Sequence, residues 1–201
     1  MLMIILVRHG LTEWNRVERF RGRAEIPLNK IGLEQARKTS RLVKGKWKPT
    51  AIYSSPLSRA MQTAQRIAKG NRLLVQPLDG LIDIDYGKWQ GLSAEEVRKD
   101  WPEMISNWYE HPEIVQIPGG ETLAQVRHRA VTTLNELCRL HFNEEIVLIS
   151  HTVVNRLILL DILGLGNNRF WDIEQEPCAI NVIEKRNEKY ILHSVNNTFH
   201  L

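Results

Sequence analysis

Two short apolar runs, each followed by a histidine, constrain the fold of this chain more than any other feature of its sequence. The first covers residues 2–7 and leads into Arg8 and His9, and the second covers 146–149 and leads through Ser150 into His151. Uninterrupted apolar runs of this length predict strands buried on both faces, as in a parallel sheet covered by helices. Ligands bind at the carboxyl ends of such strands. Both histidines are therefore candidates for a functional site.

The rest of the chain predicts helices that alternate with strands. Helical spacing of apolar residues marks 33–43, 60–67, 123–138 and 153–163. Short strands are expected at 51–53 and 73–75, with a terminal hairpin formed by 180–182 and 190–195. Ser55 is predicted to cap the helix that carries Pro56 at its first position. The pattern indicates an α/β fold, a three-layer α/β/α sandwich around a mostly parallel, mixed sheet.

Composition narrows the class of protein. The 201 residues fit one domain, and the chain has ordinary hydrophobic (43%) and charged (25%) shares. The net charge of +4 is spread along the chain without a basic block, so it favours a small anionic substrate over nucleic acid. Cys138 and Cys178 have no paired spacing, which predicts reduced thiols and no zinc site. No run is long enough for a membrane span or a signal segment, so we expect a cytoplasmic protein.

An arginine beside a strand-end histidine is suited to phosphoryl chemistry without a metal. A neutral imidazole nitrogen can attack phosphorus, and guanidinium groups bind phosphate oxygens in bidentate fashion. A lone strand-end histidine is more often structural than catalytic. The surrounding motifs change that balance.

Five motifs, in order and over nearly the whole chain, resemble those of the histidine phosphatase superfamily, which includes the cofactor-dependent phosphoglycerate mutases. They are Leu6-Val7-Arg8-His9-Gly10-Leu11-Thr12-Glu13-Trp14-Asn15, the run from Ser54 to Ala64, Tyr86-Gly87 with Trp89-Gln90-Gly91, Gly119-Gly120-Glu121-Thr122, and Ser150-His151. The resemblance implies a phosphoglycerate mutase-like fold over 1–201. It also implies a lid-like helical insertion around 93–118, where Trp108 is a candidate pocket residue.

The resemblance also implies the roles of the site residues. His9 would be the phosphorylated nucleophile, Arg8, Arg59 and His151 would form the positive pocket, and Asn15 would add a hydrogen bond. Neither a cofactor nor a metal is implied. The family supplies the leaving group with a proton from a glutamate, where this chain has the shorter Asp83. Asp85 and Glu121 stay open as alternative acids.

The second half of the chain resembles the metal-independent phosphoserine phosphatases of bacteria. That resemblance implies phosphoserine as substrate, a place in serine biosynthesis, and a substrate contact from the terminal His200. Gly22 and Thr152 are further candidates for substrate binding. Arg21 stands where that group has glutamine, which would favour a more anionic substrate. The chain lacks the Arg, His and Tyr run of the mutases after its acid, so little mutase activity is expected.

Other functions remain as alternatives. They are phosphoglycerate mutase, or phosphatase action on a phosphoglycerate derivative or on α-ribazole phosphate. An alternative from another class of protein is an inactive phosphate-binding regulatory module, which the glutamate-to-aspartate exchange supports. A magnesium-dependent aspartate nucleophile in Asp83-Ile84-Asp85 is disfavoured, because that motif requires a longer buried strand before it. A homodimer through the terminal hairpin or an edge strand is also expected to be feasible.

Overall fold

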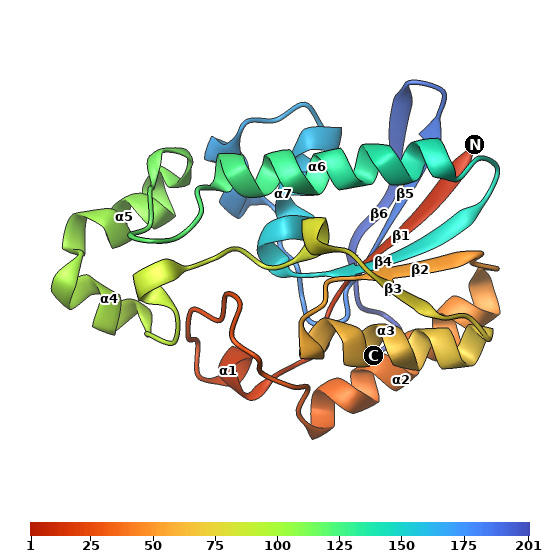
Figure 1. The fold of residues 1–201 in the computed structure, drawn as a ribbon, viewed down its shortest axis with the longest axis horizontal. Helices are drawn as coiled ribbons and strands as arrows, with labels where there is room; N and C mark the ends of the chain where they lie inside the picture. The colour runs from red at the N-terminus through yellow and green to blue at the C-terminus, as the bar shows by residue number, and fades with distance from the viewer.

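A six-stranded mixed sheet forms the centre of the protein (Figure 1). This computed structural model describes residues 1–201. The strand order is β3-β2-β4-β1-β5-β6. The strands are β1 (Leu2–Arg8), β2 (Ala51–Ser54), β3 (Val75–Pro77), β4 (Glu145–Ser150), β5 (Ile180–Arg186) and β6 (Lys189–Asn197). The first four are parallel, whereas β5 runs antiparallel to β1 and β6 antiparallel to β5. The predicted mixed sheet and terminal hairpin are confirmed.

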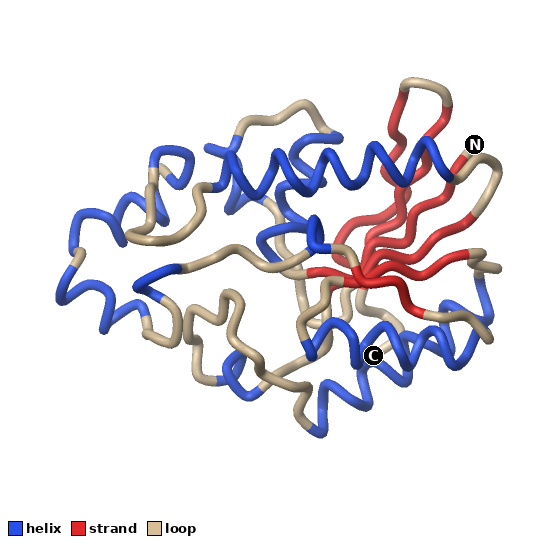
Figure 2. The backbone as a smooth tube through the Cα atoms, viewed as in Figure 1, coloured by secondary structure: helices blue, strands red, loops and turns tan.

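Helices cover both faces of the sheet, which gives the predicted three layers. Figure 2 shows the strands in red between helices in blue. The helices on one face are α2 (Lys30–Lys46) and α3 (Ser58–Asn71), and those on the other are α6 (Leu123–Leu140) and α7 (Thr152–Ile162). Alternate side chains of a strand point to opposite faces, so Ile5 packs with the α2 and α3 residues and Leu6 with the α6 and α7 residues. Both faces of β1 are therefore buried.

Two local predictions were wrong. Helix α3 begins at Ser58 after Leu57, without a side-chain cap, and Ser55 instead makes a hydrogen bond of 2.7 Å with the ring of His151. Ser55 is the first residue after β2, and its N–H donates to the carbonyl of Ile149, which brings its hydroxyl to the β4 end. The third strand is Val75–Pro77 instead of 73–75, because the end of α3 includes Arg72 in the left-handed region (φ +59°). The N–H of Leu73 still bonds the carbonyl of Ala68 in that helix.

A helical lobe lies beyond the carboxyl ends of the parallel strands (Figure 1). It contains α4 (Ala94–Asp100), α5 (Pro102–Glu110) and the short helix η3 (Pro112–Ile114). Its two connections to the body meet where the Lys88 N–H donates to the carbonyl of Pro118. Gly87 there has φ +46°, and a Cβ on it would lie 2.3 Å from the Pro118 oxygen, so only glycine fits. The region expected to contain an insertion is helical.

Aromatic packing joins the lobe to the body. Four shorter elements complete the chain. They are α1 (Glu13–Arg16), η1 (Asp79–Leu81), η2 (Gly87–Trp89) and η4 (Asn167–Asp172). Trp108 of α5 is 2% exposed, and its ring packs edge-on against Trp89 and Trp171. The predicted capping box of α6, formed by Thr122 and Gln125, is present. Rings from the body and the lobe thus share one hydrophobic cluster.

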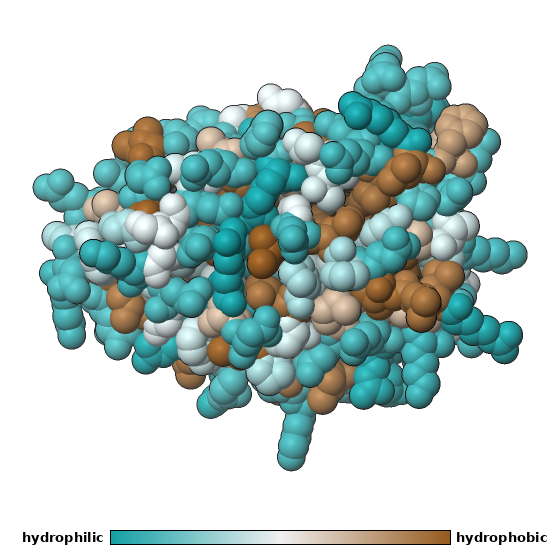
Figure 3. Space-filling model, in the orientation of Figure 1, coloured by the Kyte–Doolittle hydropathy of each residue, from teal (hydrophilic) through white to brown (hydrophobic).

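The outer surface is largely polar. On the face drawn in Figure 3, hydrophobic side chains gather in separate patches among hydrophilic ones. None of the helices combines the length and the apolar character that crossing a bilayer requires.

Candidate active site

The ends of two neighbouring parallel strands bring the two histidines together. Arg8 of β1 lies in register with Ser150 of β4, and the N–H of His9 donates to the Ser150 carbonyl. The rings of His9 and His151 then lie with their centroids 5.1 Å apart. The strand-end arrangement expected from the sequence therefore forms a single site.

One ring nitrogen of His9 has a free lone pair, as a nucleophile requires. The Nδ1–H donates to the carbonyl of Gly10 at 2.7 Å, and since a carbonyl can only accept, this bond fixes the tautomer. Nε2 makes no hydrogen bond in the protein and carries the lone pair. Burial, together with the nearby charges of Arg59 and Arg8, holds the pKa of His9 well below its usual value. The ring is therefore neutral at physiological pH.

The loop after His9 is held close to the start of α2 by two glycines. A Cβ on Gly32 would lie 2.1 Å from the carbonyl oxygen of Leu11, and one on Gly10 would lie 2.7 Å from the carbonyl oxygen of Gly32. The N–H of Gly10 donates to the hydroxyl of Thr63, one turn beyond Arg59 on α3. This contact joins the backbone at His9 to the helix that carries Arg59.

Arg59 is fully buried and anchored on three sides. Its terminal nitrogens donate to the carbonyls of Ala24 (2.9 Å) and Gly22 (2.7 Å) and to the carboxylate of Asp83 (3.0 Å). Gly22 has φ +50°, and a Cβ on it would lie 2.9 Å from the side-chain oxygen of Gln90. This conformation favours glycine, and the Gly22 carbonyl helps to fix the position of Arg59.

Asp83 lies between the arginine and the second histidine. It is 4% exposed, and its Oδ2 also lies 3.5 Å from Nδ1 of His151, without the alignment of a hydrogen bond. Arg129 of α6 donates to the carbonyl of Asp83 and to those of Gly80 and Ile82, which fixes the loop. Asp83 is thus a carboxylate held between Arg59 and His151.

The alternative acids are engaged elsewhere. Glu121 pairs with Arg129 at 2.9 Å and accepts the Asp85 N–H. Burial alone would raise the pKa of Glu121, but those hydrogen bonds outweigh burial and lower it, so the group is ionised. Asp85 accepts the N–H of Gly87 within a turn. Neither carboxylate lines the cavity that contains Asp83.

His151 is fully buried at the start of α7. Its Nε2 lies 2.7 Å from the hydroxyl of Ser55, and burial followed by the charge of Arg59 holds its pKa well below the usual value. Ser55 is a contact of the site that the sequence did not reveal, because its position after β2 was interpreted as a helix cap.

Arg8 supplies a second buried cation. It donates to the carbonyl of Gln175, and burial with the neighbouring charge of Arg21 lowers the pKa of Arg8 to about 9. The Nε atoms of Arg8, Arg21 and Arg59 are buried without a hydrogen-bond partner. A buried donor without an acceptor costs about 1–3 kcal/mol, which an anionic ligand would recover. Three guanidinium groups therefore favour an anion here.

A cavity of about 250 Å³ opens onto this cluster. Arg8, Arg21, Asp83 and Thr152 line it, so it brings together four of the residues selected from the sequence. Asn15 lines an adjoining cavity that shares Arg21 with the first. The volume is below the roughly 300–1,000 Å³ usual for drug-sized ligands, so a smaller molecule fits.

The wall of this cavity includes nine further residues, of which only Trp108 was a candidate pocket residue from the sequence. They are Tyr86, Trp108, Val153, Arg156, Phe170, Trp171, Glu174, Gln175 and Glu176. Trp108 is both a buried core residue and a wall residue of this cavity.

The structure places His200 away from this cavity. Its Nε2 makes a hydrogen bond of 2.9 Å with the hydroxyl of Thr39 on α2, and it is absent from the cavity wall. His9, Arg59 and His151 are likewise absent from the wall, so a substrate contact from His200 stays a prediction. The terminal segment instead packs its histidine against the outer helical layer.

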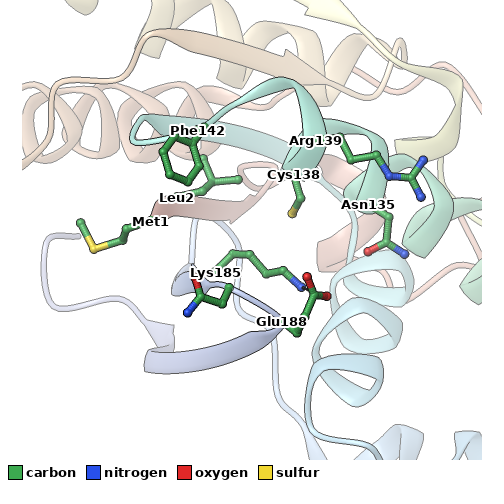
Figure 4. Close-up of a pocket in the computed structure, with 9 residues that line it drawn as sticks. Met1, Leu2, Asn135, Cys138, Arg139, Phe142, Lys185 and Glu188 are labelled. Carbon is green, nitrogen blue, oxygen red and sulfur yellow. Dashed lines mark ion pairs between the residues drawn. The ribbon is translucent and has the colours of Figure 1, made fainter.

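The largest cavity lies at the other end of β1, as Figure 4 shows. It measures about 510 Å³ and is lined by Met1, Leu2 and residues of α6 and the terminal hairpin. Its charged groups include the ion pair of Lys185 and Glu188, 3.8 Å apart. Burial raises the pKa of the Cys138 thiol there, which disfavours a reactive thiolate. Arg8, Arg21 and Asp83 of the strand-end cluster line the smaller cavity instead.

Comparison with known families identifies the class of protein. The model described as "Histidine phosphatase superfamily (branch 1)" matches residues 4–198. The chain therefore belongs to the histidine phosphatase superfamily, as the motifs indicate, and its fold is the phosphoglycerate mutase-like α/β fold.

Individual relatives narrow the comparison. Phosphoserine phosphatase 1 of Hydrogenobacter thermophilus is 36% identical over 201 residues, which cover 100% of this chain and 95% of that protein. A mutant phosphoserine phosphatase of Entamoeba histolytica, solved with phosphoserine, has a TM-score of 0.86 and 30% identity over 100% of both chains. A complex of the Entamoeba enzyme with 3-phosphoglyceric acid has a TM-score of 0.86 and 29% identity, covering 100% of this chain and 99% of that one.

Proposed function

We propose that this protein is a phosphatase that hydrolyses phosphoserine through a phosphohistidine on His9. The observation that carries the proposal is a neutral His9 with an unbonded Nε2, set among three guanidinium groups that each have a buried, unpartnered Nε. Phosphoryl transfer depends mainly on positioning and on stabilising charge on the phosphate oxygens. These residues would meet both requirements.

In the first step, Nε2 of His9 attacks phosphorus while the ester oxygen leaves. Arg8 and Arg59 hold the phosphate oxygens, and Asp83 gives its proton to the leaving alkoxide. In the second step Asp83 takes a proton from water, the water oxygen attacks phosphorus, and the bond to His9 breaks with release of phosphate. The position of Asp83 beside Arg59 and His151 supports this assignment.

Phosphoserine is favoured as substrate by the relatives named above. The cavity wall includes both cations and carboxylates, which suits a small zwitterionic ester. A second candidate is 3-phosphoglycerate, because the Entamoeba enzyme was also solved with that acid and Arg21 adds a cation to the wall. Both esters carry a carboxylate as well as the phosphate.

Three features of organisation belong to the same proposal. The segment 93–118 acts as a lid on one domain of residues 1–201, since its helices lie beyond the strand ends that form the site. The protein works in the cytoplasm, in keeping with its two free cysteines. A homodimer would use β6, which is an edge strand.

Phosphate release in the presence of EDTA tests the proposal, with phosphoserine, 3-phosphoglycerate and p-nitrophenyl phosphate as substrates. Wild type is compared with His9→Ala and with His128→Ala, an exposed histidine on α6. We expect turnover that ignores EDTA, is lost with His9→Ala and is unchanged in His128→Ala. Activity in His9→Ala, or its loss with EDTA, would exclude the mechanism. Inertness toward every ester would favour a binding module.

A further inference from the structure

A buried arginine at the far side of the cavity has no role in the chemistry described above. Arg156 lies on α7, four residues beyond Thr152, and residues with that spacing share one face of a helix. Both residues line the cavity, and Arg156 is only 5% exposed. The helix that begins at His151 thus also carries a cation to the substrate cavity.

The guanidinium group of Arg156 is held in place by its surroundings. Its Nε donates to the carbonyl of Ile173 at 2.5 Å, and the group lies over the rings of Trp171 (4.8 Å) and Phe170 (5.1 Å). Stacking and one backbone bond leave the two terminal nitrogens for other partners. The group is therefore fixed before any ligand binds.

The remaining protein partner of Arg156 is weak. Its Nη2 lies 3.4 Å from the carboxylate of Glu174, whose side chain is 71% exposed. Burial lowers the pKa of Arg156, which reflects the cost of keeping this cation out of water. A buried cation with one long, exposed partner favours a better placed anion.

A carboxylate is the anion that matches this geometry. A planar guanidinium presents parallel N–H groups to a carboxylate, and such charge-assisted pairs are among the stronger hydrogen bonds. Arg8 and Arg59 belong to the strand-end cluster that would hold the phosphate, whereas Arg156 of α7 lies against the aromatic residues of η4. We propose that Arg156 binds the carboxylate of the substrate and makes the enzyme select carboxylated phosphate esters. This inference rests on the proposed phosphatase function.

A purely structural role for Arg156 predicts a different result. If Arg156 only anchors the η4 segment through Ile173, its loss would affect all substrates alike. If it binds the carboxylate, its loss would affect only substrates that carry one. Matched pairs of esters separate the two roles, because each pair differs in the carboxylate alone or nearly so.

The experiment compares Arg156→Gln and Arg156→Lys with wild type. The substrate pairs are phosphoserine with phosphoethanolamine, and 3-phosphoglycerate with glycerol 3-phosphate. Loss of a charge-assisted pair worth about 1.5–3 kcal/mol corresponds to a roughly 10–150-fold fall in kcat/KM for the carboxylated esters, mainly through KM. We expect the esters without a carboxylate, and inhibition by inorganic phosphate, to change by less than about threefold on the same reasoning.

Arg169→Gln is the matched control, since Arg169 is an exposed arginine of the same η4 segment, paired with Asp172. It should behave as wild type with both pairs. If Arg156→Gln does not fold, Arg156→Lys decides, because it keeps the charge but loses the planar fork. Equal losses within each pair would overturn the inference.

Failure of the proposed substrate is distinguishable from failure of the inference. Wild type that hydrolyses 3-phosphoglycerate but not phosphoserine would refute the proposed substrate, and the phosphoglycerate pair would then decide the role of Arg156. Wild type that accepts esters with and without a carboxylate equally well would refute the selectivity itself.

Discussion

Replacement of Asp83 by asparagine separates its chemical role from its role in the fold. The side chain keeps its shape and its acceptor for the Ile84 N–H, but it can carry neither the proton of the acid form nor the charge of the ionised form, which pairs with Arg59 at 3.0 Å. General acid–base catalysis contributes about 10²–10⁴-fold. We therefore expect kcat/KM for phosphoserine to fall by that factor.

The leaving group provides the diagnostic contrast. p-Nitrophenolate leaves without a proton, so the phosphorylation step with p-nitrophenyl phosphate should be nearly unaffected by Asp83→Asn. Hydrolysis of the phosphohistidine would still be slow, because water would lack its base. Stopped-flow absorbance should then show a burst of one p-nitrophenolate per enzyme, followed by a slow phase. Asp85→Asn, which alters the turn at Gly87 and a half-exposed ion pair with Arg23, should show no burst.

The same substitution has a predictable cost in stability. Breaking a buried ion pair costs about 3–5 kcal/mol, and the lower value applies because Arg59 keeps the carbonyls of Gly22 and Ala24. For a chain of this size that corresponds to a fall of about 6–12 °C in Tm. Equal losses of phosphorylation rate with both substrates would refute the acid role and leave Asp83 a purely electrostatic one.

Three further predictions concern other parts of the molecule. Folding lowers the pKa values of His9 and His151, so the unfolded chain binds more protons than the folded chain below about pH 6.5. In urea unfolding, the free energy of unfolding should therefore fall as the pH drops below that value, by up to about 1.4 kcal/mol per pH unit for each histidine. An unfolding free energy that stays constant from pH 7.5 to 5.5 would contradict this prediction. Gly32→Ala should lower Tm, because its Cβ meets the Leu11 carbonyl at an overpacking cost of about 1–3 kcal/mol, whereas Gly45→Ala, with open space on the same helix, should not. Glu174→Gln removes an exposed ion pair with Arg156 that is worth up to about 1 kcal/mol, and it should lower KM for 3-phosphoglycerate by up to about fivefold. An unchanged or higher KM would show that Glu174 does not compete with the substrate carboxylate for Arg156.

The residues that the sequence predicted best are those whose positions depend on short-range structure. His9 and His151 follow buried strands that are adjacent and parallel, so their proximity follows from the sheet once β1 pairs with β4. Asp83 and Arg59 came only from the resemblance to a family. Their 3.0 Å contact depends on the loop that Arg129 holds, and no local pattern signals that contact.

The contacts that the sequence did not predict share a different cause. Ser55 satisfies the rule for a helix cap, but tertiary packing gives its hydroxyl to His151, 96 residues away. His200 lies at the chain terminus, and nothing local determines that its ring would bond Thr39. The sequence predicts a helix over 153–163 and assigns no role to Arg156 within it. The proposed role of Arg156 depends on its contact with the Trp171 ring of η4.

The residues that the sequence predicted and those that it did not lie at opposite ends of the proposed substrate. The phosphate end is formed by strand termini and the first turns of helices, where the backbone fixes the side chains and the sequence is informative. The other end is formed by Arg156 and the aromatic side chains of α5 and η4, which meet only through tertiary packing. Substitutions on α5 or η4 should therefore change which ester is hydrolysed, whereas substitutions at the strand ends should change whether any ester is hydrolysed.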